Sequence, residues 1–151
     1  NLTGSEKIGD LGLAYFSSTP KKPLETFIFN CSHCQMITNK GIEDLMVNFQ
    51  TIKSLKFDFS GCPNIDDRGL RYFRNIIEKM GELSTLSLNF SSCPKITTRG
   101  TTRFLYVFER KLSLQTLDLR LFFCENINQK CIQDLVKNVI VYIIHSAIND
   151  L

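Results

Sequence analysis

The sequence predicts an α/β solenoid in which parallel strands alternate with helices along one hydrophobic core. Three observations lead to this prediction. A set of apolar positions recurs about every thirty residues, each set contains a stretch that alternates apolar and polar residues, and each stretch is followed by a helix-start signal. Since such units bury their apolar faces only by stacking, we expect strands on a concave face and helices on a convex face.

The recurrence is anchored by four cysteines, Cys34, Cys62, Cys93 and Cys124, which lie 28, 31 and 31 residues apart. Around them, at fixed offsets, stand Ile37, Ile65, Ile96 and Ile127, then Gly41, Gly69 and Gly100, with Cys131 in place of the fourth glycine. The first residues supply a partial copy (Ile8, Gly12, Phe16) whose strand we expect to lie before residue 1. We predict a single domain over 1–151. It comprises a partial repeat at 1–20, repeats at about 24–50, 52–80, 83–111 and 114–138, and a C-terminal cap or docking segment at 139–151.

Each complete copy is expected to form one strand and one helix. The stretches LKFDF, LSLNF and LDLRL alternate apolar and polar residues with period two, as a strand buried on one face does. A residue whose side chain can accept hydrogen bonds from the free amides at a helix start follows each of the four recurring isoleucines. These residues are Thr38, Asp66, Thr97 and Asn128. We therefore predict helices at roughly 41–50, 69–80, 100–111 and 131–144.

The pattern L-x-x-L-x-L-x-F-x-x-C-x-x-I-T-x-x-G resembles the cysteine-containing leucine-rich repeat. That repeat is typical of ribonuclease-inhibitor-like horseshoes and of the substrate-binding regions of F-box proteins. The resemblance covers about residues 8–138, and Cys131 and Thr101 depart from it. It implies a right-handed α/β horseshoe of about four complete repeats whose cysteine thiols point inward, toward loop backbone. No F-box segment precedes the repeats in this sequence, so an F-box would have to lie outside this chain.

Composition narrows the classes of partner. Hydrophobic residues make up 43% of the chain and charged residues 22%, as in a globular protein. A net charge of +3 gives no reason to expect a nucleic-acid partner. The longest apolar run, VIVYII at 139–144, is too short to cross a bilayer, so we expect no membrane insertion. This run is either a last helix or cap, or a segment that docks on more protein.

Chemistry-bearing residues are few. The CSHC stretch at 31–34 has the spacing of a zinc or thiol-redox site, but the repeat register alone places Cys31 and Cys34 where they stand. The two histidines, His33 and His145, have no nucleophile in a recognisable setting. We therefore predict no metal, no cofactor, no small-molecule substrate and no catalytic residue. Six free thiols are expected, which favours a reducing, intracellular compartment: cytoplasm, organelle or cytoskeletal assembly.

Two rows of side chains are candidates for binding a partner. The concave row points away from the core on alternate strand positions: Lys56, Asp58, Asn89, Asp118 and Arg120. The basic row stands once per repeat, directly before the helix-start position: Lys40, Arg68, Arg99 and Lys130. Each row has a plain alternative, a solvated surface for the first and a solvated rim for the second.

These observations favour recognition over catalysis. The first hypothesis is a non-catalytic protein–protein interaction module, a structural or scaffolding subunit (or fragment) of a larger eukaryotic assembly. The second is the substrate-recognition arm of an F-box-type ubiquitin ligase, as the resemblance implies. The third, with the least support, is an enzyme.

Overall fold

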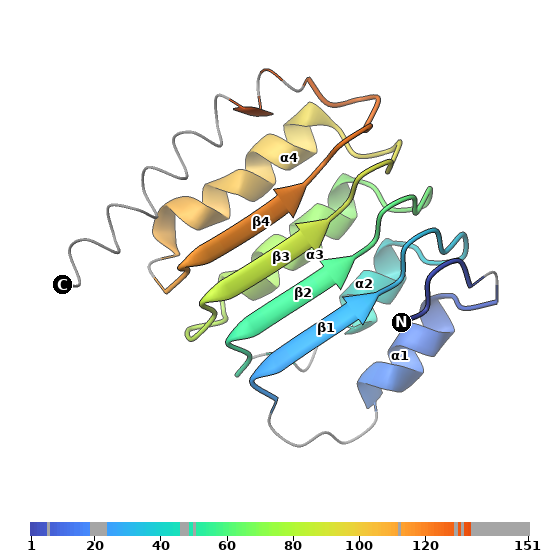
Figure 1. Ribbon diagram of the computed structural model, residues 1–151, viewed down its shortest axis with the longest axis horizontal. Coiled ribbons are helices and arrows are strands. Elements are labelled where there is room, and N and C mark those ends of the chain that lie inside the picture. The colour runs from blue at the N-terminus through green and yellow to red at the C-terminus, as the bar shows by residue number, and fades with distance from the viewer. Residues whose placement is uncertain are drawn as a thin grey trace.

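Four parallel strands form one sheet in the order β1-β2-β3-β4 (Figure 1). The computed structural model describes residues 1–5, 7–18, 24–45, 49, 51–111, 113–128, 130, 132 and 133. The strands are β1 (Thr26–Asn30), β2 (Ser54–Asp58), β3 (Thr85–Asn89) and β4 (Thr116–Arg120). The helices are α1 (Asp10–Ser18), α2 (Asn39–Leu45), α3 (Asp67–Ile77) and α4 (Thr98–Leu105), with the 3₁₀ helix η2 (Tyr106–Arg110) continuing α4.

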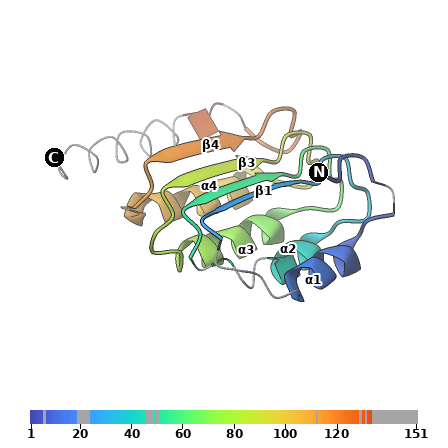
Figure 2. The ribbon, with the colours of Figure 1, turned by 60° about the horizontal axis from the view of Figure 1, so that its bottom comes forward.

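The molecule has two layers. In chain order a helix stands between each strand and the next, and all four α-helices lie on the same face of the sheet (Figure 2). The opposite face, which we call the open face, is covered by none of the described helices (Figure 2). The strands are thus apolar toward the helices and mostly polar toward the open face, with Ile28 of β1 as an exception, which explains their period of two.

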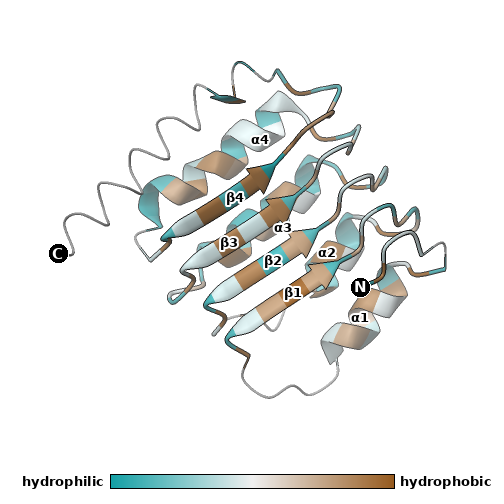
Figure 3. Ribbon diagram, in the orientation of Figure 1, coloured by the Kyte–Doolittle hydropathy of each residue, from teal (hydrophilic) through white to brown (hydrophobic). Residues whose placement is uncertain are grey.

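The strands pair in the register that the repeat offsets predict. Equivalent apolar residues face one another across the sheet: Phe27, Leu55, Leu86 and Leu117 in one line, and Phe29, Phe57, Leu88 and Leu119 in the next. Leu86 and Leu88 are fully buried, while Ser87 between them is half-buried on the open face. Apolar strand residues form a continuous band across the sheet (Figure 3).

Phenylalanine rings join neighbouring repeats in the core. The rings of Phe59 and Phe90 stack with their centroids 5.9 Å apart. Phe73 of α3 meets the ring of Phe90 edge-on at 5.6 Å and that of Phe59 at 6.0 Å. All three residues are fully buried, and each removes a large apolar area from water. The core is therefore continuous from one repeat to the next.

The helices begin two residues earlier than the sequence predicted. The N-cap residue comes directly before each helix, because its side chain turns back to the first amides. The carboxylate of Asp66 accepts a hydrogen bond from the backbone N–H of Arg68 at 2.7 Å, and the hydroxyl of Thr97 accepts one from Gly100 at 3.3 Å. The first turn of the helix thus begins before the glycine at which the sequence predicts the helix to start.

Cysteine thiols tie each loop to the preceding repeat. The Sγ atoms of Cys34, Cys62, Cys93 and Cys124 donate to the carbonyls of Leu2, Cys31, Phe59 and Phe90 respectively, each at 3.2 Å. All four cysteines are buried. The inward thiols expected from the repeat pattern are confirmed for these positions.

The loops after the strands share one backbone feature. One residue per loop has a positive φ between 57° and 68°: Gly4, His33, Gly61, Ser92 and Phe123. The first of these lies in the N-terminal segment, where the N–H of Leu2 donates to the carbonyl of Asn30 at 2.8 Å. Residues 1–5 therefore lie beside the loop after β1. The repeat boundaries expected from the sequence remain predictions.

The structure describes only a small part of the predicted C-terminal elements. Of the helix expected at 131–144, only Ile132 and Gln133 are described, and the segment 139–151, Cys131 and His145 lie outside the described residues. In the part of the chain that is described, no helix is long and apolar enough to cross a membrane.

Candidate protein-interaction surfaces

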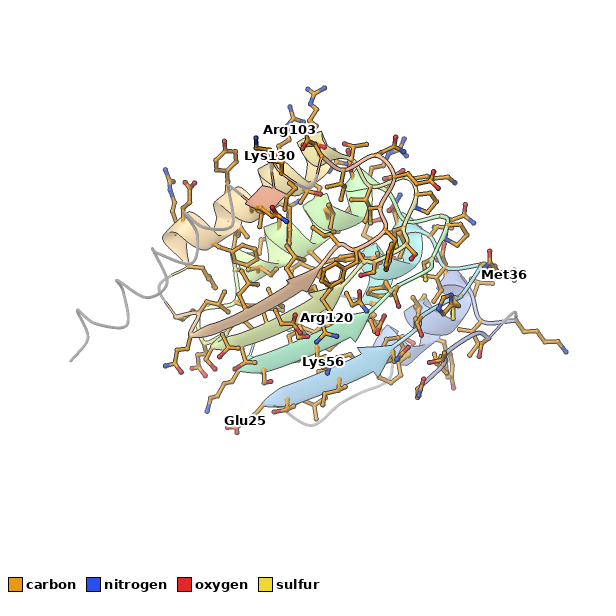
Figure 4. The ribbon with its side chains drawn as sticks, turned by 45° about the horizontal axis from the view of Figure 1, so that its top comes forward. Glu25, Met36, Lys56, Arg103, Arg120 and Lys130 are labelled. Atoms are coloured by element: carbon orange, nitrogen blue, oxygen red, sulfur yellow. The ribbon has the colours of Figure 1, made fainter. Side chains whose placement is uncertain are left out.

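The predicted concave row forms a connected polar cluster on the open face. Lys56 and Arg120 project from β2 and β4 on this face (Figure 4). Arg120 holds Asp118 with two hydrogen bonds, from Nη2 at 2.9 Å and from Nε at 3.1 Å. In the next pair, the amide of Asn89 donates to Oδ2 of Asp58 at 3.2 Å. The five predicted residues thus lie on three adjacent strands.

Charge pairing fixes the ionisation of this cluster. The hydrogen bond from Arg120 lowers the pKa of Asp118 below its ordinary value, and the hydroxyl of Ser87 and the charge of Lys56 act in the same direction. The pKa of Arg120 is raised by the same carboxylate. Asp118 therefore stays negative beside two cations across the physiological pH range.

Three residues at the strand ends have a structural role as well. Oδ1 of Asn30, Asp58 and Asn89 accepts the backbone N–H of Ser32, Ser60 and Ser91 at 2.9, 2.9 and 3.1 Å. These are Asx turns that start each loop. At Asp58 and Asn89 only part of the side chain therefore remains available to a partner.

The four residues of the predicted basic row differ in their surroundings. Lys40 is neutralised on its own helix, where Nζ lies 2.8 Å from Asp44 and 3.2 Å from Glu43. Those contacts raise the pKa of Lys40. Lys130 is exposed. Only Arg68 and Arg99 share a site.

That site is a groove of about 490 Å³ between α3 and α4, which we call the arginine groove. It is lined by Asp67, Arg68, Arg71, Arg74, Arg99, Gly100, Arg103 and Phe104. The predicted basic row has one position per repeat and therefore does not include Arg71, Arg74 or Arg103. The signal was present as helical spacing, since Arg71 and Arg74 follow Arg68 by three and six residues and Arg103 follows Arg99 by four.

Acidic side chains compensate little of this charge. Both carboxylate oxygens of Asp67 are used by Thr97, whose N–H and hydroxyl donate at 2.8 and 2.7 Å. Nε of Arg74 lies 3.5 Å from Oε1 of Glu78, yet it is buried and makes no hydrogen bond with the described residues. Four guanidinium groups (Arg68, Arg71, Arg99 and Arg103) form no ion pair within the described ranges. The arginine groove therefore carries a positive surplus.

The CSHC stretch is part of the repeat core. Cys31 and Cys34 are both buried, and burial raises the pKa of the Cys31 thiol well above its ordinary value. Across the residues that the structure describes, no group of three or more His, Cys, Asp or Glu side chains could hold a metal ion. A thiol that resists ionisation is a poor nucleophile and a poor metal ligand.

Two exposed aromatic residues were also missed. Phe122 and Phe123 follow β4, and 61% and 86% of their surfaces are exposed. Phe123 additionally has a φ of 58°, which is rare for a bulky residue. Sequence reasoning could not separate them from core phenylalanines, because their exposure depends on the loop conformation.

Comparisons with known proteins bear on the fold. No family model matches the chain, and no curated protein matches it. Among solved structures, the chain is similar to "Leiomodin-1 Actin-Binding Site 2 (ABS2)", with a TM-score of 0.71 and 13% sequence identity. The match covers 99% of this chain and 82% of that one.

This likeness identifies the fold. The parallel sheet with helices on one face, and a likeness that covers 99% of this chain, show an α/β fold that fits the leucine-rich-repeat type. The neighbour's name describes an actin-binding site of that protein, and at 13% identity the likeness shows the fold alone.

Proposed function

We propose that this chain is a non-catalytic protein–protein interaction module, acting as a structural or scaffolding part of a larger eukaryotic assembly. The observation that carries the proposal is the open face, where Lys56, Asp118 and Arg120 present fixed charges of both signs. Complementary charges at an interface orient a partner and exclude wrong ones. The exposed side chain of Ile28 on β1 adds apolar contact area beside them.

Actin is the first partner to test. The structural neighbour is described as an actin-binding site, and the match spans nearly the whole of this chain. An identity of 13% supports a shared fold, so actin binding by this chain is part of the proposal. A cytoskeletal location would follow from it.

The buried thiols support a more specific assignment of the type of repeat. We assign the repeats to the cysteine-containing, ribonuclease-inhibitor-like type, with about four repeats in a right-handed horseshoe, because four consensus thiols donate to preceding repeats. The same type favours a second candidate, the substrate-recognition arm of an F-box-type ligase. An F-box in sequence upstream of Asn1 would decide for the ligase. Five free, buried thiols fit a reducing compartment.

A matched pair of charge reversals tests the proposed interaction face. Lys56→Glu changes the open face, and Lys79→Glu makes the same change on an exposed residue just beyond α3. Cosedimentation with filamentous actin should fall for Lys56→Glu alone. Equal retention of both variants would overturn the open face as the actin site.

A second experiment tests the interaction without assuming actin. A photo-cross-linking amino acid is placed at position 56 or at position 79 in the native cell. A discrete protein adduct from position 56, lost on adding Arg120→Glu and absent from position 79, supports the proposal. No adduct from position 56 would contradict it.

A further inference from the structure

We propose that the arginine groove binds an acidic segment of a partner polypeptide, whose carboxylates pair with the guanidinium groups of α3 and α4. The inference rests on the proposed interaction function and adds a second contact surface to it. Its residues are Arg68, Arg71 and Arg74 on one wall and Arg99 and Arg103 on the other.

Charge is concentrated in this one place. The chain has 18 basic and 15 acidic residues, for a net charge of +3. Five of the basic residues line the arginine groove with a single carboxylate, that of Asp67. The remainder of the chain is close to neutral. A local surplus of this kind attracts anions to the arginine groove, while the rest of the surface stays neutral.

The fold gives these arginines few partners of opposite charge, although Arg71 also lies over the ring of Tyr72, with its Cζ 5.9 Å from the ring centroid. Isolated exposed cations such as Lys56, Lys79 and Arg110 also form no ion pair among the described residues. Where basic and acidic side chains lie close together they pair, as Lys40 does with Glu43 and Asp44 and Lys53 with Glu25. In the arginine groove, by contrast, the only ion pair is the loose one from Arg74, whose Nε lacks a hydrogen-bond acceptor among the described residues. Like charges this close repel one another, so the arrangement gains stability when anions enter.

The shape of the arginine groove suits an extended chain. Neighbouring helices pack about 8–10 Å apart, and consecutive side chains of an extended peptide point to opposite sides. A run of acidic residues lying between α3 and α4 would therefore send alternate carboxylates to Arg71 on one wall and to Arg103 on the other. Each guanidinium can bind a carboxylate with two parallel hydrogen bonds.

A nucleic acid fits the same observations less well. Guanidinium groups also bind phosphate, but single-stranded nucleic acids are held by aromatic platforms as well as by charge. The one aromatic residue lining the arginine groove, Phe104, is buried in the core and only 2% exposed. Outside the arginine groove the chain has 13 basic and 14 acidic residues (18 less 5, and 15 less 1), so its net charge adds no attraction for a longer phosphate backbone.

The test is direct binding of a fluorescein-labelled octaglutamate peptide, followed by fluorescence anisotropy at low and at physiological salt. Three proteins are compared: the unmodified chain, Arg71→Glu/Arg103→Glu, and the control Lys79→Glu/Arg110→Glu, which changes the net charge equally on exposed residues outside the arginine groove. We expect the groove variant to bind about tenfold or more weakly and the control to change by about twofold. An octaglutamine peptide should not bind. Circular dichroism checks that each variant is folded.

Three results would overturn the proposal. The first is no octaglutamate binding at low salt, and the second is equal weakening in both charge variants. The third is groove-dependent binding of tripolyphosphate or a single-stranded oligonucleotide that exceeds octaglutamate binding. Lys56→Glu on the open face should leave peptide binding unchanged. Failure of the arginine groove is therefore distinguishable from failure of the proposed function, which is measured at position 56.

Discussion

The carboxyl group of Asp67 fills the space that a side chain at position 100 would occupy. A Cβ atom built on Gly100 would lie 2.7 Å from the Cβ of Asp67 and closer still to its carboxyl group. Asp67 is held there by the N–H and hydroxyl of Thr97, so it cannot move without breaking two hydrogen bonds. The glycine of one repeat is thus required by the carboxylate of the repeat before it.

This relationship predicts coupling between the two positions. Gly100→Ala should lower the free energy of unfolding by about 1–3 kcal/mol, because the added methyl group displaces the Asp67 carboxylate. Adding Asp67→Ala should remove part of that loss, so the double variant is more stable than the sum of the single changes allows. Urea denaturation of the four proteins measures the coupling.

Gly81→Ala is the control for that cycle. A Cβ at Gly81 would meet nothing within 4 Å, so this change should be neutral or stabilising by up to about 1 kcal/mol. If Gly100→Ala were as harmless as Gly81→Ala, the steric account of the repeated glycine would be wrong.

Thr101 offers a stabilising change. Its hydroxyl is fully buried and has no hydrogen-bond partner within the described structure, at a slot where the repeat pattern usually has a larger apolar residue. Thr101→Val should raise the free energy of unfolding by about 1 kcal/mol, since it removes an unsatisfied polar group at nearly constant volume. Thr102→Val, on a half-buried neighbour, should give no such gain. A loss of stability in Thr101→Val would show that the hydroxyl has an acceptor.

The strand register makes a prediction about the core. Leu88 and Phe90 are both fully buried, as their repeat slots required. Leu88→Ala should cost about 2–5 kcal/mol, and Phe90→Ala about 3–5 kcal/mol, through lost burial and cavity formation. Ser87→Ala on the open face should cost far less. Guanidinium denaturation orders the three variants, and a Phe90→Ala cost below that of Ser87→Ala would refute the register.

Buried thiols predict loss of stability at high pH. Burial raises the pKa of Cys62 to about 11 and that of Cys93 to about 12, from an ordinary value of 9.0. The folded state therefore favours the neutral thiols. Their contribution is complete below pH 9 and is lost as the pH rises from 9 toward 12. The free energy of unfolding should fall over that window, and less steeply in Cys62→Ala.

Lys111 acts in the opposite direction and must be controlled. The residue is buried, its ammonium group donates to the carbonyl of Met80, and burial lowers its pKa. The penalty for burying its charge is present at neutral pH and is relieved as the pH rises toward 10.5. The thiol effect is therefore measured as the difference in slope between the unmodified chain and Cys62→Ala. Identical slopes would contradict the raised pKa of Cys62.

Recurrence made the strand register and the thiol positions predictable, because each offset was observed several times in one sequence. Helix starts were displaced by two residues, since the N-cap side chains of Asp66 and Thr97 already cap the turn that precedes the expected start, through the amides of Arg68 and Gly100. The pairing of Lys40 was readable from its acidic neighbours three and four residues on.

The arginine groove could not be found by comparing equivalent slots. It arises from arginines at different positions of α3 and α4, which only the packing of the two helices brings together. The double use of Asp58, as a loop turn and as an open-face group, likewise depends on loop geometry.

In the proposed arrangement, the arginines that line the arginine groove serve binding and not folding. Thermal unfolding of Arg103→Glu beside Lys40→Glu, at low and at high salt, tests this most directly. Arg103 has no acidic partner among the described residues and lines the groove with four other arginines, so its reversal should leave the melting temperature unchanged or slightly raised at low salt. Lys40→Glu breaks two ion pairs and should lower it. A melting temperature of Arg103→Glu that falls as far as that of Lys40→Glu would contradict the account.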